Sequence, residues 1–117
     1  MKTAEYPATT RSANIVKAFI TAINDEDFTT ARTYVNDDLK FEGVMGTRDG
    51  AEAYFSDMKR MKFKYAIKKA FADEDDVCLL YEIDMNGKGI FTCGWYRLEK
   101  GKISLIKVVF DPRPLLG

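Results

Sequence analysis

The sequence contains no histidine. The chain therefore has no imidazole general base, no Ser-His or Cys-His nucleophilic pair, and none of the most common metal ligand. It has only two cysteines, Cys78 and Cys93, which cannot form a structural zinc site on their own. Any acid–base chemistry would have to use aspartate, glutamate, lysine or tyrosine, and we expect no cofactor and no metal.

A net charge is also absent, because 18 lysines and arginines balance 18 aspartates and glutamates. A balanced chain has no long-range field to attract nucleic acid or an anionic membrane. No apolar run approaches the roughly 20 residues of a membrane span. Residues 1–12 are polar and lack the apolar core of a signal peptide. We therefore expect a cytoplasmic protein that binds neither nucleic acid nor a membrane.

Apolar side chains are numerous enough for one packed core. The 117 residues are 46% hydrophobic and 13% aromatic, which is typical of a folded domain and not of a disordered chain. No repeat or linker divides the sequence. We therefore expect a single domain over residues 1–117.

Helical periodicity dominates the first half of the chain. Residues 10–24 place apolar side chains at the i, i+3, i+4, i+7 spacing of one buried face; these are Val16, Phe19, Ile20 and Ile23. Residues 49–52 (DGAE) have the spacing of a capping box with Asp49 as the cap. They predict a further helix whose apolar residues are Ala51, Tyr54, Phe55 and Met58.

Between these two helices we expect a short helix and a short strand. Asp25 is a favourable N-cap for a helix with Phe28, Ala31 and Val35 on its apolar face. The polar residues 36–38 (NDD) would end that helix. A strand over residues 39–44 would follow.

Period-two alternation replaces the helical pattern in the second half. Lysines alternate with apolar residues over residues 62–68, and three further runs follow at residues 77–85, 90–98 and 102–110. Turn-forming residues bound each of these three runs. Three helices followed by an antiparallel meander predict an α+β domain with the helices packed on one sheet face.

Two turn motifs predict the register of the last three strands. Residues 86–87 (NG) are a strong signal for a two-residue hairpin, which would pair the residues on either side of it. Residues 99–101 (EKG) have glycine in the third position, as in a three-residue loop with a bulge. That loop would pair Tyr96 with Ser104.

These registers divide the strands into two faces. One face is expected to collect Leu79, Tyr81, Ile83, Met85, Ile90, Thr92, Gly94, Tyr96, Ser104, Ile106, Val108 and Phe110. The other is expected to collect Leu80, Glu82, Asp84, Phe91, Cys93, Trp95, Arg97, Ile103, Leu105, Lys107 and Val109. Both faces are too apolar to lie in water. We expect helices to cover the first face, and a second copy of the chain to cover the other around Phe91, Trp95 and Leu105.

Four segments of the sequence, in this order, carry a resemblance to a known family: residues 19–28, 35–41, 46–53 and 109–114. Together they resemble the nuclear transport factor 2-like superfamily, and specifically its SnoaL-like and ketosteroid-isomerase-like members. Residues 19–28 look like the family's first helix and the junction after it, and residues 35–41 look like the start of its first strand. Residues 46–53 resemble the loop before its third helix, and residues 109–114 are similar to a frequent C-terminal segment. The resemblance spans nearly the whole chain.

The resemblance implies a cone-shaped fold, in which three N-terminal helices pack in a strongly curved antiparallel sheet. An apolar cavity would lie at the wide end of the cone. Members of the superfamily commonly form dimers through the outer sheet face, which agrees with the apolar second face expected from the strand registers.

The known catalytic residues of the family do not carry over to this chain. The tyrosine and the two aspartates of ketosteroid isomerase would align with Phe19, Gly43 and Gly94. SnoaL-type cyclases and scytalone dehydratase use histidine with acidic partners, and this chain has no histidine. The resemblance therefore implies the fold without the known machinery.

Other acidic residues remain as catalytic candidates. Limonene epoxide hydrolase, a further relative, uses an Asp-Arg-Asp group, and Asp84, Arg97 and Glu82 supply similar residue types here. The registers place these three on the outer face, where ion pairs are the alternative, although one unrecognised bulge would turn them inward. Glu42 stands next to Gly43, but alternation with Phe41 points its side chain outward.

For the basic stretch and for the two cysteines, we expect structural roles and no functional site. Residues 59–69 contain Arg60 and several lysines, which are typical of a solvated strand face that discourages edge pairing. Cys78 and Cys93 fall diagonally on neighbouring strands, roughly 7–8 Å apart, beyond the reach of a disulfide. We expect both thiols to be free.

The leading hypothesis is a homodimeric domain that binds a small apolar or amphipathic molecule. The expected lining of its pocket is Phe19, Ile23, Phe41, Tyr54, Met58, Tyr81, Ile83, Thr92, Tyr96, Ile106, Val108 and Phe110. One alternative is a cofactor-free isomerase, dehydratase or cyclase that acts on an apolar ring compound with Glu42 or Asp84 and a tyrosine donor. The other alternative is a dimeric protein-interaction module.

Overall fold

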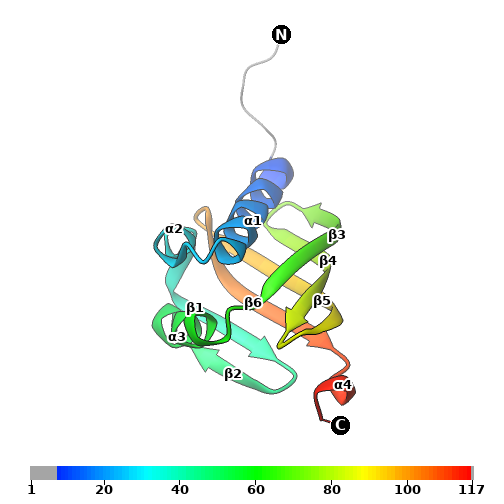
Figure 1. The fold of residues 1–117 in the computed structure, drawn as a ribbon. Helices are drawn as coiled ribbons and strands as arrows, with labels where there is room; N and C mark the ends of the chain where they lie inside the picture. Colours follow the sequence, from blue (N-terminus) through cyan, green and yellow to red (C-terminus); the bar gives the residue numbers. More distant parts are fainter. Residues whose placement is uncertain (1–7, 117) are drawn as a thin grey trace.

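A single curved β-sheet surrounds the first helix of the molecule (Figure 1). The computed structural model describes residues 8–116. Its elements are α1 (Ala8–Asn24), α2 (Phe28–Arg32), β1 (Val35–Gly43), β2 (Gly46–Asp49), α3 (Ala51–Met61), β3 (Lys64–Asp73), β4 (Asp76–Met85), β5 (Lys88–Glu99), β6 (Lys102–Phe110) and α4 (Arg113–Leu116). Within the described part of the chain, no helix is long and apolar enough to cross a membrane.

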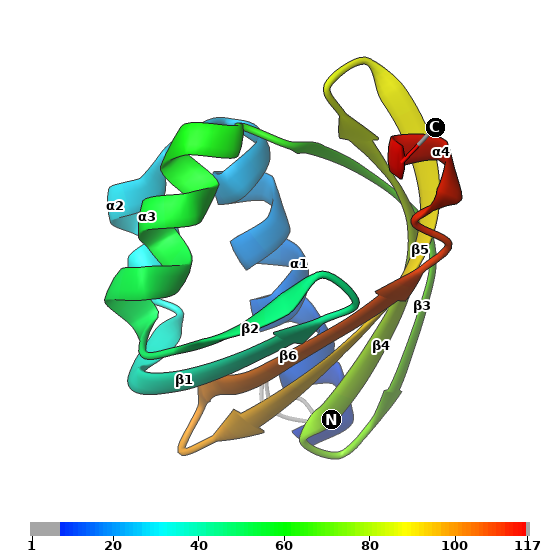
Figure 2. The same ribbon diagram turned by 90° about the horizontal axis from the view of Figure 1, so that it is seen from below.

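The sheet has six strands in the order β2-β1-β6-β5-β4-β3. It curves around α1, while α2 and α3 close the open side (Figure 2). The expected α+β fold with helices packed in a curved sheet is confirmed. The expected antiparallel meander is found in β3 to β6, but β1 pairs with β6 in parallel. This parallel contact joins the β1–β2 hairpin to the meander.

Helix α1 forms because one of its faces is continuously apolar. Its four predicted core residues are at most 2% exposed, so the predicted helix and its buried face are confirmed. At the end of α1, the side chain of Asn24 donates to the carbonyl oxygen of Tyr65 at 2.9 Å and accepts from its N–H at 2.7 Å. These two bonds hold the C-terminal end of α1 against β3.

The segment after α1 differs from the expectation. Helix α2 is capped by Asp27, whose carboxylate accepts from the Thr30 N–H at 3.1 Å, and not by Asp25. The helix ends at Arg32, so Val35 and residues 36–38 belong to β1 instead of a helix. The tertiary pairing of Val35 with Ile103 of β6 overrides the local helical pattern.

Helix α3 is present as expected, and the four apolar residues predicted for it are buried. The expected cap is wrong. Gly50 occupies the N-cap position with φ of 96° and no side-chain bond, while Asp49 lies in β2. Its carboxylate pairs with Lys40 across the β1–β2 hairpin at 3.1 Å, so Asp49 stabilises the strand pair instead of the helix.

The register of the β4–β5 hairpin is confirmed. Met85 pairs with Lys88, and the two turn residues have the positive φ values of a tight hairpin turn, 55° at Asn86 and 87° at Gly87. Because this register holds along the whole hairpin, Glu82 and Asp84 point to the outer face, as expected.

The register of the β5–β6 hairpin differs by two residues. Lys100 and Gly101 form a two-residue turn with φ values of 54° and 78°, so Tyr96 pairs with Ile106 and not with Ser104. A shift of two residues leaves Ile106 and the residues after it on the expected face. Nearer the turn, a bulge between Arg97 and Leu98 shifts the pairing by one residue, so that Leu98 pairs with Ile103. Ile103 is completely buried, although it was expected on the outer face.

On the inner face of the sheet, the side chains of Tyr81 and Tyr96 pack closely over Gly94. The hydroxyl oxygens of Tyr81 and Tyr96 lie 2.7 Å apart in a hydrogen bond. A Cβ atom at position 94 would lie 2.2 Å from the Tyr81 hydroxyl oxygen and 3.0 Å from the Tyr96 ring. Glycine is therefore the residue that lets the two tyrosines meet over β5.

We predict that Gly94→Ala lowers the free energy of unfolding by about 3 kcal/mol, the upper end for overpacking a core. The added methyl group would force the buried Tyr81 out of its position. Urea unfolding followed by circular dichroism measures this loss. Gly89→Ala, in the same strand, is the control, because its Cβ would meet only the mobile end of Glu82 at 3.2 Å. Equal stability of the two variants would contradict the prediction.

Candidate functional site

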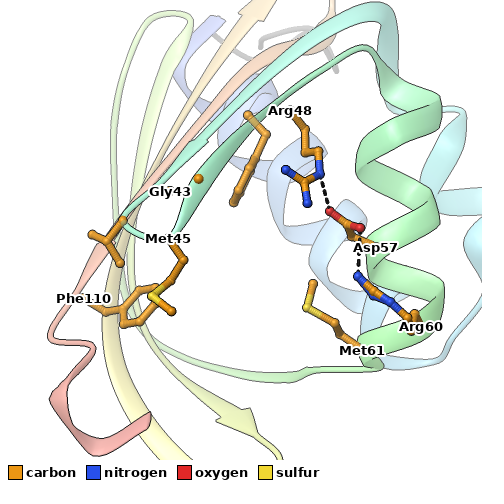
Figure 3. A pocket seen from close by; sticks show the side chains of 10 residues that line it. Gly43, Met45, Arg48, Asp57, Arg60, Met61 and Phe110 are labelled. Atoms are coloured by element: carbon orange, nitrogen blue, oxygen red, sulfur yellow. Dashed lines mark hydrogen bonds and ion pairs between the residues drawn. The ribbon is translucent and has the colours of Figure 1, made fainter. Parts of the chain in front are cut away.

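A cavity of about 200 Å³ opens at the wide end of the curved sheet (Figure 3). It lies between the β1–β2 turn, one side of α3 and the end of β6. Its lining residues are Phe41, Gly43, Val44, Met45, Gly46, Arg48, Asp57, Arg60, Met61 and Phe110. We call this space the mouth cavity.

Apolar side chains make most of the wall of the mouth cavity. Met45 and Phe110 lie on one side and Met61 on the other (Figure 3). The Phe41 ring lies with its centroid 5.4 Å from that of Tyr54, so it separates the cavity from the core. A Cβ at Gly43 would lie 3.0 Å from the Phe41 ring. A side chain at position 43 would therefore have to displace this ring.

The remaining wall carries three charged side chains. Arg48 forms an ion pair with Asp57, with 2.7 Å between Nε and Oδ2. Arg60 donates from Nη2 to Oδ1 of the same carboxylate at 3.0 Å. The Asp57 side chain is only 21% exposed, whereas both guanidinium groups reach further into solvent. One carboxylate therefore lies between two cations on the cavity wall (Figure 3).

Most of the expected lining residues lie behind this cavity. Phe41 and Phe110 line it. The others are buried in the core, and they are Phe19, Ile23, Tyr54, Met58, Tyr81, Ile83, Thr92, Tyr96, Ile106 and Val108. Ring contacts fill that interior, because Phe19 packs edge-on against Tyr96 at 6.3 Å between centroids. The mouth cavity therefore lies outside the core in which the pocket was expected.

The polar groups expected to face a ligand are satisfied inside the core. Tyr81 and Tyr96 bond to each other, and the Thr92 hydroxyl donates to the Ile90 carbonyl at 3.0 Å. Burial raises the pKa of the Tyr81 hydroxyl, and it raises the pKa of the Tyr96 hydroxyl well above its usual value. These tyrosines stabilise the core as neutral hydrogen-bonding groups.

The two acids named as catalytic candidates lie away from the mouth cavity. Glu42 forms an ion pair with Lys107 at 3.5 Å on the outer face, since its neighbours Phe41 and Gly43 take the inner side. Asp84 accepts a hydrogen bond from the Gly87 N–H at 2.8 Å within the β4–β5 turn. Neither side chain lines the cavity.

Of the ten lining residues only Phe41 and Phe110 were expected, and the eight others include all three charged ones, Arg48, Asp57 and Arg60. A signal for Asp57 is present in the sequence, because it falls between Tyr54 and Met61 on one helix face and interrupts an otherwise apolar stripe. Arg60 belongs to the basic stretch of residues 59–69, which is expected to be a solvated face. Arg48 has no comparable signal, because only the turn after β1 brings β2 back toward α3.

The fold and the sequence both match known proteins. The model of the SnoaL-like domain matches residues 16–106. The chain belongs to this family. No curated protein sequence matches the chain.

Solved structures of related proteins have the same nuclear transport factor 2-like fold as this SnoaL-like domain. An NTF2-like protein of unknown function from Cytophaga hutchinsonii is 46% identical, with a TM-score of 0.90 and full coverage of both chains. An LEH-like epoxide hydrolase from M. tuberculosis is 26% identical with a TM-score of 0.81, covering 94% of this chain and 90% of its own. Bal32a, from a soil-derived mobile gene cassette, is 18% identical with a TM-score of 0.81, covering 88% and 91%.

The outer face of this SnoaL-like domain holds a separate polar cluster. Arg97 forms two hydrogen bonds with Asp76, at 2.9 and 3.1 Å, and Trp95 donates from its indole nitrogen to Asp76 at 2.9 Å. Arg97 points outward as expected, but its partner is Asp76 instead of Asp84 or Glu82. Two hydrogen bonds hold the pKa of the Asp76 carboxyl below its usual range. The bond from Arg97 has the larger effect and the bond from Trp95 the smaller.

The two thiols are close together on the same face. Cys78 and Cys93 are free and diagonal, as expected, but their Sγ atoms are only 3.4 Å apart. Burial raises the pKa of the Cys78 thiol to about 11, so it is protonated at neutral pH. Within residues 8–116, no group of three or more cysteine, aspartate or glutamate side chains could hold a metal ion.

We predict that Asp76→Asn reduces the loss of stability in acid. A carboxyl group whose pKa is lowered by folding stabilises the fold above its unfolded pKa, and this contribution disappears as the pH falls through the folded pKa. The urea midpoint of the wild type should therefore fall more steeply between pH 6 and pH 3 than that of the variant. Glu74→Gln removes one negative charge from the adjoining turn and is the comparison. Parallel curves for wild type and Asp76→Asn would refute the prediction.

Proposed function

We propose that this SnoaL-like domain binds a small amphipathic molecule in the mouth cavity, as a homodimer in the cytoplasm. The observation that carries the proposal is a cavity of about 200 Å³ with apolar walls and one polar wall. A cavity of about 150 Å³ is large enough for benzene, so this cavity fits a ligand of one or two fused rings. Ligand sites of this kind use a few polar groups to orient a mostly apolar molecule.

The placement of the acids favours binding over acid–base catalysis. A general base must lie within hydrogen-bond reach of the substrate, directly or through one water. Glu42 and Asp84 are engaged elsewhere, and both oxygens of Asp57 face guanidinium groups. The positions that align with the ketosteroid isomerase residues hold Phe19, Gly43 and Gly94, which supports a domain without that machinery.

A second copy of the chain is the partner that we propose for the outer face. Its large apolar side chains are exposed to an extent that a lone soluble domain rarely tolerates in one patch: Phe91 is 60%, Phe71 57%, Val109 52% and Trp95 38% exposed. These residues form one surface on β3 to β6, and Leu105, which pairs with Arg97, lies at one end of it. A two-fold axis would cover the same patch on both copies.

We predict that 2-naphthamide, a neutral two-ring probe, binds the mouth cavity. In a two-dimensional NMR titration, the backbone amides of Gly43, Gly46 and Met61 should shift, while those of Phe91 and Trp95 should not. Met45→Trp would fill the cavity and should abolish binding. Leu116→Trp, at an exposed position in α4 that does not line the cavity, should bind as wild type does. Shifts confined to the outer face would contradict the proposed site.

We predict that the wild type is a dimer in solution, with about twice the 13.3 kDa mass of one chain by light scattering. Phe91→Glu would place a charge at the most exposed apolar residue of the proposed interface and should give a folded monomer. Leu116→Glu makes the same change at an exposed apolar residue outside the patch and should leave the dimer intact. A monomeric wild type would reject the dimer and favour a surface for a different protein.

A further inference from the structure

The charged wall of the mouth cavity carries an excess of positive charge. Arg48 and Arg60 contribute two cations, and Asp57 contributes one anion, so the wall has a formal charge of about +1. Among residues 8–116, no other charged side chain lines the cavity. An anionic group of a ligand would therefore neutralise this wall.

Each guanidinium also has donors left over. Arg48 uses Nε for Asp57 and donates from Nη1 to the Thr47 carbonyl at 2.8 Å, while Arg60 uses Nη2 for Asp57. Among the described residues, Nη2 of Arg48 and both Nε and Nη1 of Arg60 have no acceptor in the structure. A guanidinium has five N–H donors in a planar fork that matches a carboxylate. The unused donors are the complement of such a group.

We propose that the polar end of the ligand is a carboxylate and that Arg48 and Arg60 bind it. This inference rests on the proposed binding in the mouth cavity and adds the chemical class of the ligand. The ring system would lie against Met45, Met61 and Phe110, and the carboxylate would bridge the two guanidinium groups. The ligand class is thus an aromatic or alicyclic carboxylic acid in its ionised form.

Asp57 has the role of a positioning residue in this arrangement. It holds both guanidinium groups on one wall before a ligand arrives, which reduces the entropy lost on binding. Each of its oxygens already faces a guanidinium group, so its negative charge is outweighed by two positive charges at the same wall. The same wall that attracts a carboxylate would therefore repel an ammonium or amidinium group.

Three probes of nearly equal shape test the charge preference. They are 2-naphthoate, 2-naphthamide and 2-naphthamidine, which carry a negative, a neutral and a positive group on the same ring system. Isothermal titration calorimetry at low salt should give an affinity for 2-naphthoate about tenfold higher than for 2-naphthamide, the lower end for hydrogen bonds to a charged group. The affinity for 2-naphthamidine should be the lowest of the three. The preference for 2-naphthoate should weaken as salt is added.

Variants assign the preference to the two arginines. Arg48→Gln and Arg60→Gln should each reduce the preference for 2-naphthoate, and the double variant should abolish it while still binding 2-naphthamide. Lys59→Gln removes the same charge from an exposed neighbour of Arg60 that does not line the cavity, and it should keep the wild-type preference.

The outcomes separate this inference from the proposed function. Equal binding of the three probes, or a preference unchanged in the double variant, would overturn the carboxylate site and leave the proposed cavity intact. Failure of all three probes to bind would reject the proposed function and, with it, the carboxylate site. Loss of the preference in Lys59→Gln as well would show a general charge effect and would also overturn the inference.

Discussion

The packing of the core depends on the close approach of the Tyr81 hydroxyl to the backbone of Gly94. The missing side chain lets Tyr81 reach Tyr96, and the bond between their hydroxyls, at 2.7 Å, satisfies both polar groups in the core. Phe19 of α1 then packs on Tyr96. Around this bond the interior of the curved sheet is a packed core, in which Phe19, Tyr81 and Tyr96 are at most 2% exposed.

Because this interior is packed with side chains, the mouth cavity lies at the wide end of the sheet, where different polar groups line it. The core offers neutral hydroxyls whose pKa burial has raised, whereas the mouth cavity offers two guanidinium groups and a carboxylate. Phe41 forms the boundary, because its ring contacts Tyr54 on one side and the cavity on the other. A ligand at the mouth would thus meet apolar walls and charge, but no buried acid.

Neighbouring residues of β5 point to opposite faces of the sheet and have different partners. Tyr96 faces the core, while Trp95 and Arg97 face outward and bond to Asp76. One sheet therefore separates a core that shapes the mouth cavity from an outer face that supports the proposed dimer. Because β5 lies between β4 and β6, a shift of its register by one residue would exchange the two faces and destroy both.

The sequence by itself determined the features that depend on neighbouring residues: the buried face of α1, the existence of α3, the strands of the meander and the turn at Asn86-Gly87. It did not determine pairings between distant segments. The β-strand at Val35 and the parallel contact of β1 with β6 depend on residues far along the chain, and so does the bulge that buries Ile103. The charged wall was decided by how these elements pack in three dimensions, since the turn after β1 and the bend at Gly50 bring Arg48 of β2 to Asp57 of α3.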